Sequence, residues 1–329
     1  ELTITHSRLA KLNLASIRGF TAGQLTDAGG FVNGKIQIKG NTKTPKVNGT
    51  LQFNNAFVTP TMLGERFTLN DDKIQIDETG FHFNQFSLTD TTGSEAILNG
   101  DVFTKDFRNY TFGLSFKADN FNVVHSTKAE NQLFYGDLNI DADIKINGSM
   151  EAPTINATIN ANKETDFIFV LPSNDPEVVS REGVVNFVDK SAPKDTTAKI
   201  DFRDTLINTQ AFAGMNVSAI FTTDTAAKFT LVIDERNGDA LKVQGEANLS
   251  GGVDESGKLS LTGNYALTNG SYQLTFNFLK RKFDIQRGSV ITWTGDPTSA
   301  IVNITALYET KAAPIDLVQP MLAGQSENE

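Results

Sequence analysis

The stretch GKIQIKGNTKTPKVNGTLQF, residues 34–53, returns in altered form as LNIDADIKINGSMEAPTINATINA at residues 138–161. In both, an alternating pattern runs into a glycine, a proline follows five residues later, and a second alternating pattern begins. Apolar residues at every second position are typical of a strand with one apolar face and one polar face. The repeated unit therefore predicts a sheet built from many similar strands.

The same period of two continues at residues 74–76, 229–233, 241–249, 259–267 and 302–308. We expect roughly 20 strands, and an open sheet of that many strands curls or folds over on itself. If successive strands stack at about 4.8 Å, the sheet extends on the order of 100 Å. The predicted object is long.

Asn-Gly dipeptides are typical of tight hairpins, so we expect mostly antiparallel neighbours. They occur at residues 33–34, 48–49, 99–100, 147–148, 237–238 and 269–270. Helical periodicity is scarce. Short helices are predicted for residues 14–27, 126–136 and 314–324, and surface loops for residues 172–183 and 189–197.

A phase slip at Asn84 and Gln85 predicts a β-bulge within one strand. Together these patterns predict an all-β fold: an elongated, mostly antiparallel sheet curled into a trough with an apolar interior and few short helices. We interpret residues 1–329 as a single elongated β domain and a fragment of a larger chain. Residues 316–329 are expected to be partly frayed.

Composition excludes several classes of protein. The 329 residues carry a net charge of -10, which provides no basic footprint for nucleic acid. Because the chain has no cysteine, it can form neither disulfides nor thiolate metal sites. No run of about 18 apolar residues occurs, so any membrane anchor is expected outside this segment. The 24 phenylalanines, against 5 tyrosines, indicate a need for a dry environment.

No arrangement of residues suggests catalysis. His6, His82 and His125 are far apart in sequence, and we expect ordinary surface histidines. Asp141 and Asp143 share one strand face, where they could hold a cation, but neighbouring polar residues favour a solvated face. Nucleophile and phosphate-binding motifs are absent. We therefore predict neither an enzyme nor a cofactor nor a metal site.

The alternating apolar positions are the candidate site, because they would line the interior of the trough. An alternative for the same residues is the packed core of a flattened sandwich, which would exclude any ligand. The candidate groove-lining residues are Ile36, Ile38, Leu51, Phe53, Ile140, Ile144, Ile146, Leu231, Ile233, Leu259, Leu261, Phe276 and Phe278.

Two stretches carry a resemblance to a known family. The first is QFSLTDTTGSEAILNGDV, residues 85–102, followed by DFRNYTFGLSFKADNFNVV, residues 106–124; the second is FDIQRGSVITWTGDPTSAIVNITALYE, residues 283–309. Both resemble the C-terminal half of the TamB family of translocation and assembly module proteins. The most specific positions are Phe283, Ile285, Gly288, Ile291, Gly295, Pro297, Ile304, Ala306 and Tyr308.

The resemblance implies a periplasmic segment of a protein that is anchored in the inner membrane and reaches the outer membrane. It implies a sheet folded as a β-taco, similar to bridge-like lipid-transfer proteins of the AsmA-like group. The implied partner is an outer-membrane barrel of the Omp85 class, engaged through a region beyond Glu329. The N-terminal anchor would likewise precede this segment.

Three functions remain open at this point. The first is a conduit that shields phospholipid acyl chains, since moving each CH₂ out of water is worth about 0.8 kcal/mol. The second is a chaperone or assembly factor for outer-membrane or secreted proteins, which would hold polypeptides at its edge strands. The third is a structural solenoid or adhesin with a filled interior. An open apolar face would favour the first.

Overall fold

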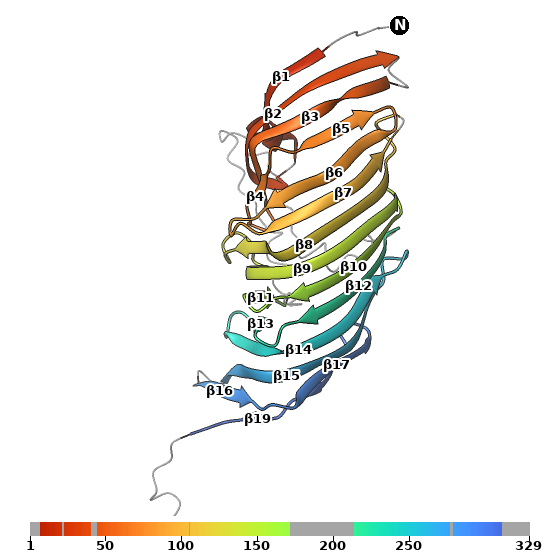
Figure 1. Cartoon of the computed structure of the whole chain (residues 1–329). Helices are drawn as coiled ribbons and strands as arrows, with labels where there is room; N and C mark the ends of the chain where they lie inside the picture. The colour runs from red at the N-terminus through yellow and green to blue at the C-terminus, as the bar shows by residue number, and fades with distance from the viewer. Residues whose placement is uncertain are drawn as a thin grey trace, which may run out of the picture.

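The computed structural model describes residues 7–21, 23–40, 45–104, 106–171, 214–276 and 279–310. Within these residues the chain is all-β, as predicted, and its 19 strands form one sheet that stacks in chain order (Figure 1). One 3-10 helix, η1 (Leu14–Phe20), follows the first strand. The predicted loops at 172–183 and 189–197, the helix at 314–324 and the frayed tail lie outside the described residues.

The strands differ in length. The longest are β2 (Leu25–Gly40), β3 (Pro45–Pro60), β8 (Thr111–Ser126), β9 (Phe134–Ser149), β14 (Asp239–Val253) and β15 (Leu259–Phe276). The others are β1 (Ser7–Asn13), β4 (Phe67–Leu69), β5 (Lys73–Asp77), β6 (Gly80–Thr89), β7 (Glu95–Phe103), β10 (Pro153–Ala161), β11 (Asp166–Val170), β12 (Asn216–Thr223), β13 (Lys228–Asp234), β16 (Leu279–Ile285), β17 (Ser289–Gly295), β18 (Ile301–Asn303) and β19 (Ala306–Leu307).

Some rows of the sheet hold two short strands end to end. Thus β10 pairs with residues 140–148 of β9, and β11 pairs with residues 134–137 of the same strand. The other shared rows are β4 with β5, β12 with β13, β16 with β17, and β18 with β19. With five shared rows, 19 strands make 14 rows. The stack is therefore about 60 Å long, and the expected 100 Å is wrong because it assumed one strand per row.

Most pairings are antiparallel, as predicted. The two parallel pairings in the described part of the chain are β10 with β12 and β11 with β13. Six strands, β9, β10, β12, β14, β13 and β11, form a closed ring of hydrogen-bonded neighbours, and the other strands bond outside it. The ring arises because β9 and β14 each span both halves of the two shared rows between them.

A line of backbone irregularities crosses the sheet from β8 to β19, and we call it the crease. In the shared rows it is the gap between two strands, at residues 162–165, 224–227 and 286–288. In β8 it is a register shift between Ala118 and Phe121. In β15 it is the unpaired Thr268, opposite the step from Gln244 to Gly245. Because these positions oppose one another, the strands change direction at the same place in row after row.

A corresponding line crosses the N-terminal rows. Gly30, Asn55 and Gln85 have φ values of +82°, +46° and +53°, and residues 70–72 separate β4 from β5. The register between β6 and β7 shifts between Phe83 and Phe86, which confirms the predicted bulge at Asn84 and Gln85.

Threonine side chains satisfy the backbone groups that the crease leaves unpaired. The Thr165 hydroxyl donates to the carbonyl of Asn139 at 3.1 Å and accepts from its N–H at 3.2 Å. The Thr223 hydroxyl likewise donates to the carbonyl of Gly245 and accepts from the N–H of Ala247, both at 2.9 Å. Since buried backbone groups need partners, these bonds let the ladder break without orphaned donors.

The prediction that Asn-Gly dipeptides mark hairpins is wrong for most of them. Asn237-Gly238 lies in the turn from β13 to β14, and Asn147-Gly148 lies near the end of β9. The other four lie inside strands, where glycine allows the backbones to approach closely. A Cβ on Gly49 would lie 2.2 Å from the carbonyl oxygen of Lys35, and one on Gly270 would lie 2.5 Å from the carbonyl oxygen of Lys242.

The predicted helices are largely wrong. Of residues 14–27, the 3-10 helix takes 14–20, capped by Asn13, whose side chain accepts from the N–H of Ala15 at 2.9 Å. Of residues 126–136, Ser126 ends β8, residues 127–133 form a turn and a bend, and residues 134–136 begin β9. Glu130 accepts from Thr127, but Asn131 accepts from the N–H of Leu133 at 3.0 Å, and this local bond ends the turn.

The crease depends on glycine at Gly245, and this makes a testable prediction. An alanine Cβ there would lie 2.1 Å from the carbonyl oxygen of Ala266, so Gly245→Ala should cost about 1–3 kcal/mol of unfolding free energy through overpacking. Gly19→Ala is the control, since nothing lies within 4 Å of its Cβ position. Urea unfolding should show a lower midpoint for the first variant only; equal midpoints would contradict a tightly closed crease.

Candidate functional site

One face of the sheet is apolar along its length, and we call it the apolar face. Paired residues on neighbouring strands lie on the same face, so the register traces it from row to row. One such ladder runs from β7 to β17 through Leu98, Phe116, Ile144, Ala157, Ala219, Gly251, Leu261 and Gly295. The N-terminal rows continue it, with Ile36, Gly49, Ile76, Phe81 and Val102.

Burial on the apolar face is deepest beside the crease and falls toward the strand ends. In β15, Leu267 is 2 % exposed and Tyr265 is 7 %, whereas Leu261 is half-buried and Leu259 is 40 % exposed. Side chains from both sides of the crease pack together, as Ile285 and Ile291 do across the gap between β16 and β17. The sheet is therefore bent toward its apolar face, which lies on the inner side of the bend.

Apart from Phe276 and Phe278, the predicted groove residues share this face but differ in burial. Ile140 is buried beside the crease, and Ile233 and Leu259 are exposed near strand ends. Phe276 belongs to β15, and Phe278 lies outside the described residues. The half-buried members are Ile36, Ile38, Leu51, Phe53, Ile144, Ile146, Leu231 and Leu261.

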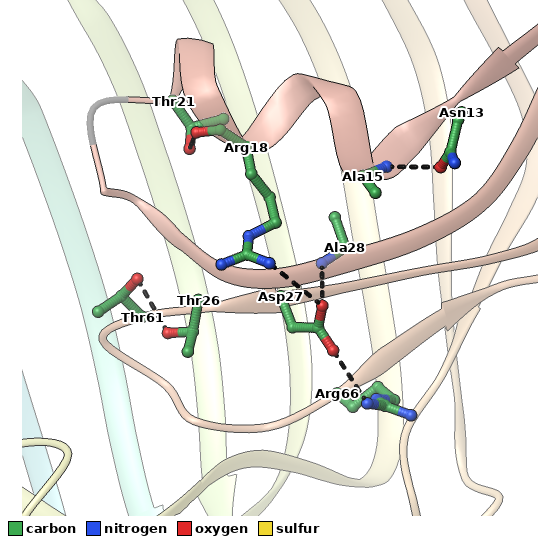
Figure 2. Close-up of polar contacts among 9 residues, drawn as sticks. All are labelled: Asn13, Ala15, Arg18, Thr21, Thr26, Asp27, Ala28, Thr61 and Arg66. Carbon is green, nitrogen blue, oxygen red and sulfur yellow. Dashed lines mark hydrogen bonds and ion pairs between the residues drawn. The ribbon is translucent and has the colours of Figure 1, made fainter.

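The helix η1 covers the N-terminal part of the apolar face. Its Leu14 is 6 % exposed and packs with Val32 and Ala56, against which Leu51 and Phe53 also lie. Figure 2 shows Arg18 reaching from η1 toward Asp27, at 3.9 Å, while Arg66 holds the other oxygen of Asp27 at 3.2 Å. Leu14 was not among the predicted site residues, although Asn13, a residue type favoured at helix N-caps, precedes it in the sequence.

Aromatic side chains gather on the apolar face. Phe53 meets Phe86 edge-on at 5.5 Å between ring centroids, and Phe229 meets Tyr265 edge-on at 6.4 Å. Edge-to-face geometry is favoured for such pairs because the ring edge is positive and the ring face negative. The phenylalanine excess in the sequence therefore serves this face.

The opposite face is polar. Asp143 lies 3.4 Å from the amine of Lys117, and Asp141 accepts from the side-chain amide of Asn162 at 2.9 Å. Both contacts agree with the expected polar, solvated face. Two hollows of 280 and 610 Å³ open among polar residues, the larger between the β5–β6 and β7–β8 turns. Neither lies over the crease, so the apolar face itself is the candidate site.

The histidines are more involved than expected. His82 is only 26 % exposed and bridges two carboxylates, with Nδ1 at 2.6 Å from Asp101 and Nε2 at 3.0 Å from Asp77. Hydrogen bonds to Asp77 and then Asp101 raise the pKa of His82, and bonds from Thr79 and His82 lower the pKa of Asp77. His125 is 65 % exposed and pairs with Asp137, and His6 lies outside the described residues.

The fold and the site place this chain in the class of extended all-β proteins with one continuous apolar face. A family profile described as the TamB C-terminal domain matches residues 84–328, which is more than half of the chain. The chain therefore belongs to the TamB family. No curated protein and no solved structure matches it.

Family membership implies a role in outer-membrane biogenesis, in a transport or assembly protein rather than a known enzyme. Members are usually found in the cell envelope and typically partner with TamA. Across the residues that the structure describes, no helix has both the length and the apolar character to cross a membrane.

The His82 bridge predicts a pH dependence of stability. Because its pKa is raised in the folded state, the bridge contributes fully below the unfolded value of 6.5 and is lost as the pH rises through the folded value. The melting temperature of the wild type should therefore fall toward that of His82→Gln as the pH rises above 6.5. His125→Gln, at a more exposed site, should show a weaker effect. Parallel pH profiles for the wild type and His82→Gln would rule the bridge out.

Proposed function

We propose that the apolar face holds phospholipid acyl chains and shields them from water as lipids pass between the inner and outer membranes. The observation that supports this most is the continuity of the face, which the register carries from β2 to β17 with most of its side chains half-buried. A packed core would bury these side chains. The bent sheet is on this proposal a trough whose interior receives the lipid.

The energetics need no reacting group. Each CH₂ that leaves water contributes about 0.8 kcal/mol, so a chain of about 16 carbons gains enough to remain on the face. Headgroups stay in water on the open side of the bend. Transport then consists of replacing water along a path of similar sites, with Ile36, Ile38, Ile144, Ile146, Leu231 and Leu261 lining it on either side of the crease.

The N-terminal rows differ in this scheme. Leu51 and Phe53 pack against the cluster of Leu14, Val32 and Ala56, so η1 takes up part of the face beside them. We propose that the path narrows there. The protein would act in the periplasm, with an outer-membrane barrel of the Omp85 class as its partner.

An assembly chaperone is the second candidate, and one observation favours it. Ile301 and Val302 in β18 are 61 % and 60 % exposed, and β18 pairs on one side only, with β17, among the described residues. An exposed apolar edge strand can take up an extended polypeptide by β-augmentation. Such binding would use the sheet edge and leave the apolar face empty.

The test compares lipid binding by variants that carry new charges on one or the other face of the same strands. Protein is purified without detergent and extracted with organic solvent, and phospholipid is quantified by mass spectrometry. Ile146→Asp with Leu261→Asp places charges on the apolar face, and Asn147→Asp with Thr262→Asp places them on the adjacent polar positions. A charge on an apolar surface strongly disfavours acyl chains. The apolar-face variant should therefore bind at least tenfold less lipid than the wild type, and the polar-face variant should bind as much as the wild type.

Circular dichroism provides the control for folding of both variants. Wild-type protein of normal fold without lipid would overturn the proposal, and so would lipid retained by the apolar-face variant. Bound peptide in place of lipid would support the chaperone.

A further inference from the structure

The cluster of apolar residues beside the crease contains a hydroxyl without a partner. Tyr265 is 7 % exposed, and its hydroxyl oxygen has no hydrogen bond within the described residues. The buried residues around it are Val243, Ala247, Leu267, Ile285 and Ile291. The other buried side-chain oxygens without a partner, on Asn33, Glu65, Asn122 and Ser126, lie outside this cluster.

Two other hydroxyls on the apolar face, on Thr223 and Ser289, are bonded to the protein itself. Thr223 donates to the carbonyl of Gly245 at 2.9 Å, and Ser289 donates to the carbonyl of Gln286 at 2.8 Å. Phenylalanine at position 265 would fill the same space with no polar group to satisfy. An unpaired buried hydroxyl destabilises the fold, so its presence calls for a partner that the protein does not supply.

The ring of Tyr265 is held in a defined position. The residue pairs with Ala247 on one side and Ile291 on the other, and its ring meets Phe229 of β13 edge-on. Small residues, Gly245 and Ala247, separate the two rings in β14, which leaves room for this contact across the crease. Burial raises the pKa of Tyr265 to about 12, so the hydroxyl keeps its proton and remains a donor.

We propose that the Tyr265 hydroxyl donates a hydrogen bond to the ester carbonyl of an acyl lipid lying on the apolar face. This inference rests on the proposed function and specifies the ligand as an acyl ester. A hydrocarbon chain offers no acceptor to the hydroxyl, and a dialkyl ether lipid lacks the carbonyl. The lipid would rest with its ester linkage near the crease, its chains along the crease and its headgroup toward the open side.

The entering lipid has to part the side chains that enclose the hydroxyl. Leu249 and Trp293 are half-buried and pack against this cluster, so they are among the side chains that would move aside. In the lipid-free protein, apolar side chains cover the Tyr265 hydroxyl. In the lipid-bound protein, this hydroxyl donates to the ester carbonyl.

The experiment compares two lipids that differ in the carbonyl alone. The full 329-residue chain is incubated with vesicles that contain equal amounts of diacyl phosphatidylcholine and its dialkyl ether analogue. Bound lipid is then extracted and the ratio measured by mass spectrometry. Wild-type protein should enrich the diacyl lipid by about 2- to 10-fold, as the net free energy of one hydrogen bond gives.

Tyr265→Phe should bring the ratio to one by lowering the bound diacyl lipid, with no loss of bound ether lipid. Tyr272→Phe is the matched control, because Tyr272 lies in the same strand and on the same face, where its ring stacks on Phe283. This control should keep the wild-type ratio.

The outcomes separate the inference from the proposed function. Wild-type protein that binds neither lipid would overturn the function. Wild-type protein that binds both equally would overturn the inference and leave the function standing, and this readout needs no variant. A preference for the diacyl lipid that survives in Tyr265→Phe would also overturn the assignment.

Discussion

The structure depends on one constraint, which is that apolar side chains on alternate positions must leave water although no second layer packs against them in the described residues. In a sandwich, another sheet covers the apolar face. Here the sheet bends along the crease and partly covers itself. Leu267 is buried with neighbours from the other side of the bend, such as Ile285, while side chains farther along its strand, such as Leu261, stay half-buried.

The bend has a local chemical cost that particular residues offset. A strand that changes direction loses ladder hydrogen bonds, and Thr165 and Thr223 replace them with side-chain bonds to buried backbone groups. Gly245 permits an approach of backbones that a Cβ would prevent. Polar and small residues inside strands, which weaken an ordinary flat sheet, are here required by its curvature.

Much of the fold could be predicted because the period of two is a local property. Alternation assigned the residues of β9 and β15 to faces, and the phase slip at Asn84 and Gln85 located a bulge. Other features depend on tertiary pairing that no short window contains. The Asn-Gly dipeptides look the same in a hairpin and in a close approach between strands. The row shared by β10 and β11 is invisible to a count of strands.

The candidate site was predictable to the same extent: the face of Ile144 follows from alternation, but its half-burial follows from the bend. Leu14 was missed as a residue of the site because a helix predicted from residue 14 does not by itself show which surface it covers. Tyr265 was missed because a tyrosine within an apolar strand pattern is ordinary, and only the surrounding structure reveals that its hydroxyl lacks a partner.

The composition of the innermost positions sets how closely the two walls of the bend approach. Alanine recurs there, and Ala56, Ala96, Ala142, Ala161 and Ala247 are all at most 7 % exposed. Larger side chains at these positions would push the walls apart, since interiors are close-packed. The walls themselves carry isoleucine, leucine and phenylalanine. Where alanine occupies these positions the two walls can approach closely, and this relates the alanines to the function proposed for the face.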